Sequence, residues 1–324
     1  MKRLLLLTVA ATLLIVSATP AFADGKRYAV IVQGASGDPQ YATLHRGWVD
    51  SLATLLRSEF KIDGPALSIL VETPKDGELR STAESVRTVF GRLAKDTKAD
   101  DLVFVMLIGH GSGDAAAAKF NLIGPDLTAE EWGALLKPVP ARIAFVDSTS
   151  SSFPFLAGLA GPNRIVITAT STYAQKYHTV FPDAFIRAMT ASEADADKNG
   201  RISVMEAFTY ASRLVAQHYE QAGTMSTERA SIDDTGDGKG RDANTTGEDG
   251  NVAAFTYLAP SAIPTVSDPE VQQMLLRQQS LTEQVDDLRR RKATMSAADF
   301  DQEFEKLIVD LALVSRDIRR KIKK

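Results

Sequence analysis

Two stretches of the chain place polar side chains at the end of an apolar run. In DLVFVMLIGHGSG (101–113) the run ends at His110-Gly111. In RIAFVDSTSSSFPFLAG (142–158) it ends at Asp147, and five hydroxyl residues (148–152) follow. A histidine near a hydroxyl group is a combination used in nucleophilic catalysis. The chain contains no cysteine, so the most reactive nucleophile of such sites is absent.

The most specific motif is the acidic stretch DADKNGRISVME (195–206), which matches a twelve-residue EF-hand loop. Gly200 stands at position six, where the loop turns sharply. The oxygen ligands at positions one, three, five, seven, nine and twelve would come from Asp195, Asp197, Asn199, the Arg201 carbonyl, Ser203 and Glu206. We therefore expect a calcium ion with a structural role, and no organic cofactor. The alternative is a solvated Asp/Asn/Gly turn.

A second acidic stretch, DDTGDGKGRD (233–242), matches only the first half of such a loop. Asp233, Thr235 and Asp237 fit positions one, three and five, but Asn244 stands where position twelve needs a glutamate. A weaker second calcium site and a flexible acidic loop are both open here.

The elements that must position these motifs alternate between strand and helix from residue 28 to residue 170. Uninterrupted apolar runs such as 101–109 indicate strands buried on both faces. Helical spacing of apolar residues, with capping boxes at Ser81/Glu84 and Thr128/Glu131, indicates the intervening helices. The alternation predicts an α/β fold, a mostly parallel sheet with helices on both faces. Ligands of such sheets bind beyond the carboxyl ends of the strands, where both polar stretches lie.

The chain changes character after residue 170. Residues 182–222 read as a helix, the acidic loop and a second helix, and NVAAFTYL (251–258) reads as a last strand. A linker (259–269) leads to 270–324, where apolar residues at 3–4 spacing predict two amphipathic helices in an antiparallel hairpin, the second capped by Ser296 and Asp299. This hairpin either packs on the main domain (24–258) or serves for self-association or partner docking.

The amino terminus reads as a secretory signal peptide (1–23). Lys2 and Arg3 precede an apolar run (4–16), and Ala21-Phe22-Ala23 offers a cleavage site. The run is shorter than the ~20 residues of a membrane span. We expect secretion across the inner membrane to a periplasmic or extracellular location, with no membrane span after the signal is removed. The net charge of −4 carries no basic block, so nucleic acid is not an expected partner.

The order of the motifs resembles the caspase-like fold of cysteine peptidases, in particular the legumain (asparaginyl endopeptidase) branch. The resemblance covers roughly residues 27–220, and YAVIVQGASGDPQY (28–41) is similar to the first strand and glycine-rich loop of that branch. It implies that His110 corresponds to the catalytic histidine. It implies that Gly111 is the glycine whose N–H helps to form the oxyanion hole. A peptide or protein ligand is then expected at the carboxyl edge of the sheet.

The resemblance breaks at the nucleophile. Asp147 and Ser151 match the residues around the family's cysteine, but Thr149 stands in the position of the cysteine and Ser152 replaces a glycine. A threonine hydroxyl is a weak nucleophile without a closely held base. We therefore expect a catalytically inactive homologue. The alternatives are an active hydrolase that uses Thr149, or the neighbouring Ser148 or Ser150, with His110, and an incorrect family assignment.

Other family features are missing or lack context. The basic residue with which legumains bind a substrate Asn or Asp is not evident, since Ala42 stands near its place, with Arg46 close by. The remaining histidines, His45, His178 and His218, belong to no motif, and we expect them at the surface or in helix packing.

Overall fold

The computed structural model describes residues 25–322 except 114–116, 174, 176–177 and 262. The expected signal peptide (1–23) therefore lies outside the described residues. The described chain forms a mixed α/β structure around a seven-stranded sheet with the order β10-β9-β8-β4-β1-β2-β3. All neighbouring strands are parallel except β10, which is antiparallel to β9. The strands are β1 (Arg27–Gln33), β2 (Leu67–Val71), β3 (Leu79–Arg80), β4 (Leu102–Ile108), β8 (Arg142–Asp147), β9 (Arg164–Thr168) and β10 (Ser231–Asp233).

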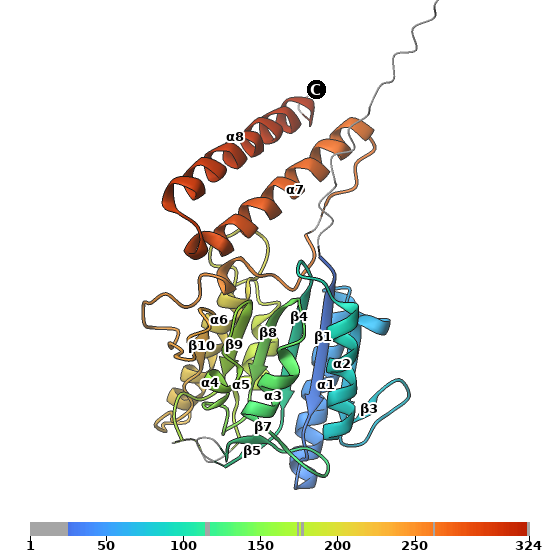
Figure 1. Ribbon diagram of the computed structural model, residues 1–324, viewed down its shortest axis with the longest axis vertical. Helices are drawn as coiled ribbons and strands as arrows, with labels where there is room; N and C mark the ends of the chain where they lie inside the picture. The colour runs from blue at the N-terminus through green and yellow to red at the C-terminus, as the bar shows by residue number, and fades with distance from the viewer. Residues whose placement is uncertain (1–24, 114–116, 174, 176–177, 262, 323–324) are drawn as a thin grey trace, which may run out of the picture.

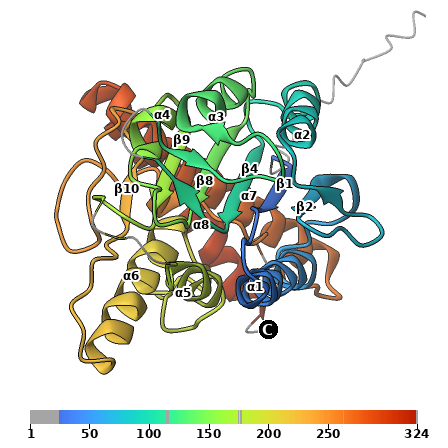
Figure 2. The ribbon, with the colours of Figure 1, turned by 90° about the horizontal axis from the view of Figure 1, so that it is seen from below.

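Helices cover both faces of this sheet (Figure 2). One hydrophobic core joins the sheet to α1 (Pro39–Ser58), α5 (Phe181–Ala188) and α6 (Val204–Gln221), and the other joins it to α2 (Ala83–Asp96), α3 (Ala129–Leu136) and α4 (Phe155–Leu159). Every residue of β4 is buried because this strand lies in the middle of the sheet with helices on both sides. The expected parallel sheet between two helical layers is confirmed, and this architecture is compatible with a caspase-like fold.

Shorter elements complete the domain. A small antiparallel sheet of β5 (Gly111–Ser112), β6 (Lys119–Phe120) and β7 (Leu127–Thr128) directly follows His110. The 3₁₀ helices are η1 (Gly64–Ala66), η3 (Ala253–Phe255) and η4 (Lys292–Thr294).

Two local predictions were wrong and one was right. The segment 251–258 contains η3 rather than a strand. The last described strand is β10, whose final residue, Asp233, begins the acidic stretch 233–242. The cap of α2 is Thr82, which accepts a hydrogen bond from the Ser85 N–H, and not Ser81. The capping box of Thr128 and Glu131 at the start of α3 is present.

The last two helices, α7 (Pro269–Arg291) and α8 (Ala297–Ile322), lie side by side and project from the amino-terminal end of the sheet (Figure 1). Ser296 accepts the Asp299 N–H at the start of α8, as the sequence predicts. Leu281, Val285 and Leu288 of α7 are buried, as is Phe300 of α8. Within the described residues, no helix combines the length and the hydropathy that crossing a bilayer requires.

Candidate functional site

The polar motifs meet where the sheet changes its direction of winding. β1 and β4 are adjacent, but α1 follows β1 on one face and α3 follows β4 on the other. The loops that leave two such strands diverge, and this opens the crevice in which α/β sheets usually bind ligands. His110 follows β4 directly, and the 148–152 loop follows the next strand, β8.

Three histidines and a tyrosine gather at this crevice, although no sequence motif linked His45 or His178 to His110. The His110 ring lies edge-on to Tyr41 of α1 at 4.7 Å and to His45 of α1 at 5.1 Å, measured between ring centroids. His178, which precedes α5, lies 5.4 Å from Tyr41. His45 and His178 are therefore neighbours of the candidate site. His45 also packs within α1 against Trp48, and His218 is exposed, as expected. Tyr41 and His45 are four residues apart, so helical periodicity alone could have paired them.

Burial lowers the affinity of two of these histidines for protons. The pKa of His45 is lowered to about 4, mainly by burial and in smaller part by the positive charges that His110 and His178 can carry. Burial and His178 also lower the pKa of His110, although a hydrogen bond with the Ser36 backbone opposes this shift. His45 and His110 are consequently held in the neutral form near pH 7.

The lowered pKa of His45 makes its contribution to the free energy of unfolding depend on pH. Its pKa is depressed in the folded state, so between about pH 4 and 6.5 the unfolded chain binds a proton that the folded chain does not. The contribution of His45 to the free energy of unfolding therefore rises with pH across this window, by about 1.4 kcal/mol per pH unit at most. We expect His45→Phe to remove this rise, measured by urea unfolding at several pH values. His218→Phe, at an exposed position, is the matched control, and an unchanged profile in His45→Phe would contradict the assignment.

Gly111 brings the histidine loop against the hydroxyl loop. A Cβ atom at this position would lie 2.7 Å from Thr149 Oγ1 and 2.9 Å from Ser151 Cβ, so only glycine permits this approach. Thr149 is 1% exposed, and no hydrogen bond joins its hydroxyl to His110 among the described residues. Thr149 and His110 thus lie on the same side of the molecule, but the histidine does not hold the hydroxyl as a base would hold a nucleophile.

Ser148 and Ser152 of the same loop make hydrogen bonds to neighbouring strands. Ser148 Oγ donates to the Leu107 carbonyl at 2.5 Å, and the Ser148 carbonyl accepts from Thr179 Oγ1. Ser152 Oγ lies 3.1 Å from Thr170 Oγ1 and accepts the Thr170 N–H. These bonds fasten the loop to β4 and to the end of β9.

Asp147 is the buried acid of this loop. It is 0% exposed, its Oδ1 accepts the Thr149 N–H at 3.0 Å, and its Oδ2 has no partner among the described residues. Burial raises the pKa of Asp147 to about 7, although the Thr149 N–H favours the ionised form. The carboxyl group is therefore about half protonated near neutral pH.

Arg46, the cation near the expected substrate-binding position, is engaged elsewhere. Its guanidinium donates to both oxygens of Glu78 at 2.8 and 2.6 Å and to Asp50 at 2.9 Å. A paired guanidinium of this kind does not offer a free charge to an acidic or amide side chain of a substrate.

A pocket of about 530 Å³ lies at the same edge of the sheet, at the amino ends of α3 and α4. Phe153 and Tyr173, whose rings meet edge-to-face at 5.7 Å, form part of its wall. Glu130 is the charged residue in the lining, which otherwise consists of Ala129, Pro154, Leu156, Ala157, Gly158 and Gly238. Its size and apolar lining suit a side chain of a peptide.

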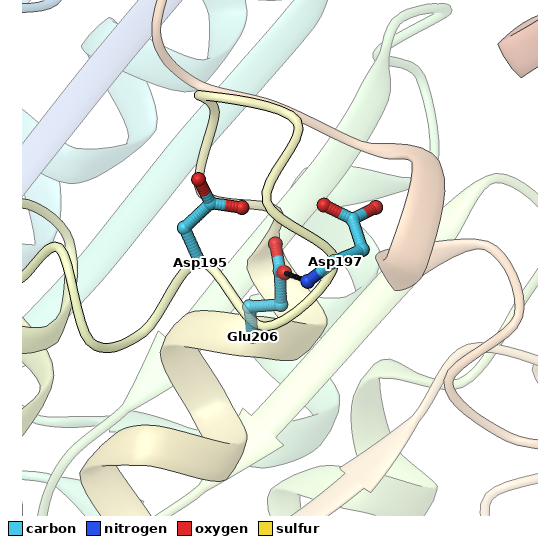
Figure 3. A group of neighbouring side chains, drawn as sticks. All are labelled: Asp195, Asp197 and Glu206. Carbon is cyan, nitrogen blue, oxygen red and sulfur yellow. Dashed lines mark hydrogen bonds between the residues drawn. The ribbon is translucent and has the colours of Figure 1, made fainter.

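The acidic loop brings its carboxylates together at the start of α6. Ligand oxygens of Asp195, Asp197 and Glu206 lie within 4.8 Å of one another, and this is the only such acidic or histidine group among the described residues. Figure 3 shows Glu206 extending from the first turn of α6 between the two aspartates, with a hydrogen bond from the Asp197 N–H. Gly200 has φ +81°, as the sharp turn requires.

Backbone hydrogen bonds already shape this loop. Asp195 accepts the N–H groups of Asn199 and Gly200 at 3.1 and 2.9 Å. Glu206 and Ser203 also form a capping box for α6, so Glu206 has a structural role independent of any ion. In the second acidic stretch, both oxygens of Asp233 accept N–H groups of the turn, from Gly236 and Gly238.

Arg201 connects the acidic loop to the helical hairpin. Its guanidinium lies 3.8 Å from the centre of the Tyr257 ring and 3.7 Å from a carboxylate oxygen of Asp286 in α7. Asn199 donates to the Tyr257 hydroxyl at 3.3 Å. Arg290 of α7 also donates to the Phe255 carbonyl. The carboxyl-terminal end of α7 is thus the end attached to the domain.

Comparisons with known proteins return distant structural similarities. No protein-family model and no curated protein sequence matches the chain. The structure of GSU0716 from Geobacter sulfurreducens is similar at 15% identity and a TM-score of 0.39, covering 58% of this chain and 89% of its own. The structure of drICE, a caspase, is similar at 10% identity and a TM-score of 0.37, covering 62% of this chain and 87% of its own.

Proposed function

We propose that the protein is a secreted, catalytically inactive homologue of legumain- and caspase-like peptidases that binds a peptide or protein partner. The observation that carries the proposal is the state of Thr149, which occupies the expected nucleophile position. Its hydroxyl is buried, and no hydrogen bond joins it to His110 among the described residues, so it lacks the contact through which a histidine base would activate it. A hydroxyl without a general base lacks the ~10²–10⁴-fold assistance that such a contact provides.

The partner would bind along the carboxyl edge of the sheet. The pocket beside Phe153 and Tyr173 is large enough for an aromatic or aliphatic side chain of a peptide. Glu130 at its rim would favour a neighbouring basic residue of that peptide over an acidic one.

Calcium binding to residues 195–206 is the second part of the proposal. The convergence of Asp195, Asp197 and Glu206 supports it, because hard divalent cations select clustered carboxylate oxygens. The ion would connect the end of α5 to the start of α6 and would act in stability rather than in chemistry.

The alternative function is hydrolysis by Thr149, or by Ser148 or Ser150, with His110 as the base. The lowered pKa of His110 favours it, since a neutral imidazole can accept a proton near pH 7. A fluorophosphonate probe and a peptide-library cleavage assay separate the two functions. We expect neither labelling nor cleavage. Labelling that is lost in Thr149→Ala or in Ser150→Ala would establish the hydrolase instead.

Peptide binding can be tested by filling the pocket. Ala157 lines the pocket and is exposed, so Ala157→Phe places a ring in the pocket without disturbing the core. We expect peptides selected from a phage-displayed random library on the wild-type protein to bind this variant at least tenfold more weakly. Ala222→Phe, at an exposed position that does not line the pocket, is the matched control. Equal binding to both variants would place the partner elsewhere.

A further inference from the structure

The outer face of α8 carries an apolar stripe that the rest of the described chain leaves exposed. The described residues include eight exposed large apolar side chains, and three of them lie in a six-residue span of α8. They are Ile308 (37% exposed), Val309 (50%) and Leu313 (43%). Ala312 is exposed between them. Helical geometry, at about 100° per residue, places these four side chains on one face.

This stripe lies opposite the face with which α8 contacts α7. The α7-facing seam contains Phe300 and Ile318, which are buried, and Ser315, which accepts a hydrogen bond from Gln278 of α7 at 2.8 Å. Around the helix axis, Val309 and Leu313 lie about 140–180° from Phe300 and Ile318, and Ile308 at the edge of the stripe lies about 80° from them. A helix that covered the stripe would therefore lie on the far side of α8 from α7.

Charged side chains flank the apolar stripe along α8. They are acidic toward the start of the helix and basic toward its end. Asp301 and Glu305 lie toward the start of α8, and Arg316 and Arg320 lie toward its end, on the same face as the apolar residues. Arg316 already contacts Asp317 at 3.0 Å, but this is an exposed contact between adjacent residues, which costs little to exchange.

The pattern is self-complementary about a point between residues 310 and 311. An antiparallel copy of α8 with a twofold axis at this point places Ile308 opposite Leu313 and Val309 opposite Ala312. The same axis places Glu305 opposite Arg316 and Asp301 opposite Arg320. A parallel copy would instead place each charge opposite the same charge. Isologous twofold contacts require this kind of match of a surface with itself.

We propose that this stripe is the interface of a twofold-symmetric homodimer, formed by antiparallel pairing of α8 with α8 of a second copy. The apolar centre supplies the affinity, and the end charges fix the antiparallel alignment, as flanking charges do in coiled coils. The mixed sign of the charges argues against an anionic membrane surface, which attracts uniformly basic faces. One helix pair buries less than a standard interface, so we expect a dissociation constant in about the micromolar range.

Charge reversal tests the alignment directly. Sedimentation velocity of the purified wild-type protein over a concentration series should show a reversible monomer–dimer equilibrium. E305R and R316E each place like charges opposite one another twice, and each should raise the dissociation constant at least about tenfold. The double variant E305R/R316E restores both pairs and should dimerise like the wild type. A double variant as weak as the single variants would overturn the antiparallel alignment.

Two further variants test the stripe itself. I308E should leave the protein monomeric, whereas L276E, at an exposed position of α7 (50% exposed), should leave the dimer intact. Circular dichroism confirms that each variant is folded. A wild type that is monomeric at every concentration, or a dimer that survives I308E, would refute the proposal. A wild type that stays monomeric but binds anionic vesicles would identify a membrane surface as the occupant instead.

The absence of native cysteine allows a final check of geometry. An oxidised mixture of E305C and R316C chains should form the mixed disulfide, while each chain alone should not. Positions 305 and 305 of the two copies would be about 16 Å apart along the antiparallel pair. Disulfide formation by E305C alone would indicate a parallel pair and would overturn the proposal. These tests are independent of the proposed function, because none of the altered residues lies near the crevice or the acidic loop.

Discussion

Adding calcium is expected to raise the unfolding temperature of the wild-type protein by several degrees, and chelation should reverse the increase. A ligand that binds only the folded chain stabilises it by about 2.7 kcal/mol at a concentration 100 times its dissociation constant. Differential scanning calorimetry with calcium and with EGTA measures the difference. The increase follows from the cluster of Asp195, Asp197 and Glu206, whose mutual repulsion the ion would relieve.

Glu206→Gln distinguishes the loss of calcium binding from the loss of the helix cap. Glutamine keeps the capping box with Ser203 but loses the bidentate carboxylate, so the calcium-dependent increase should vanish while the unfolding temperature in EGTA changes little. Asp237→Asn, in the second acidic stretch, is the matched control and should retain the full increase. If Glu206→Gln responded to calcium like the wild type, the loop would not be the binding site.

Asp147→Asn is expected to remove a contribution to stability that falls as the pH rises. The pKa of Asp147 is raised in the folded state to about 7, so above pH 4 the unfolded chain releases a proton that the folded chain retains. The contribution of Asp147 to the free energy of unfolding therefore falls as the pH rises from about 4 to 7, by roughly 4 kcal/mol in total. Asparagine keeps the acceptor for the Thr149 N–H and removes this fall.

In the wild-type protein the contributions of Asp147 and His45 oppose each other between pH 4 and 6.5. Asp147→Asn should therefore unmask the His45 contribution, with stability rising with pH. His45→Phe should unmask the Asp147 contribution, with stability falling. Urea unfolding at half-unit pH intervals distinguishes these slopes, and the double variant should lose both contributions. Parallel profiles of the two single variants would show that one of the groups titrates normally.

The elements of the sheet could be predicted because their signals are local. The uninterrupted apolar run of β4 and the capping box of Thr128 and Glu131 depend on a few consecutive residues. β10 escaped prediction because its three residues are stabilised by pairing with β9, a contact between segments about 65 residues apart along the chain. The apolar residues of 251–258 resembled a strand although η3 packs them against α6.

The candidate site was predictable only in part. The ends of two apolar runs in the sequence were enough to identify His110, Gly111 and Thr149 as candidates. In the structure, Gly111 does lie against Thr149. His45 and His178 come from α1 and from the segment before α5, so no short motif contains them. Their meeting with His110 depends on which face of the sheet each helix covers, and this is set by the winding of the chain around β1.

The hairpin contacts the domain near one end of α7, so a small rotation at this contact moves the opposite end of the helix by a larger distance. Arg201 of the acidic loop and Arg290 of α7 make their contacts at the carboxyl-terminal end of α7. The opposite end of α7, at Pro269, is about 26 Å from Asp286 along the helix axis. A tilt of about 10° at the attachment would therefore move the far end by about 4–5 Å. Small adjustments of the loop around Arg201 are thus amplified with distance from the sheet.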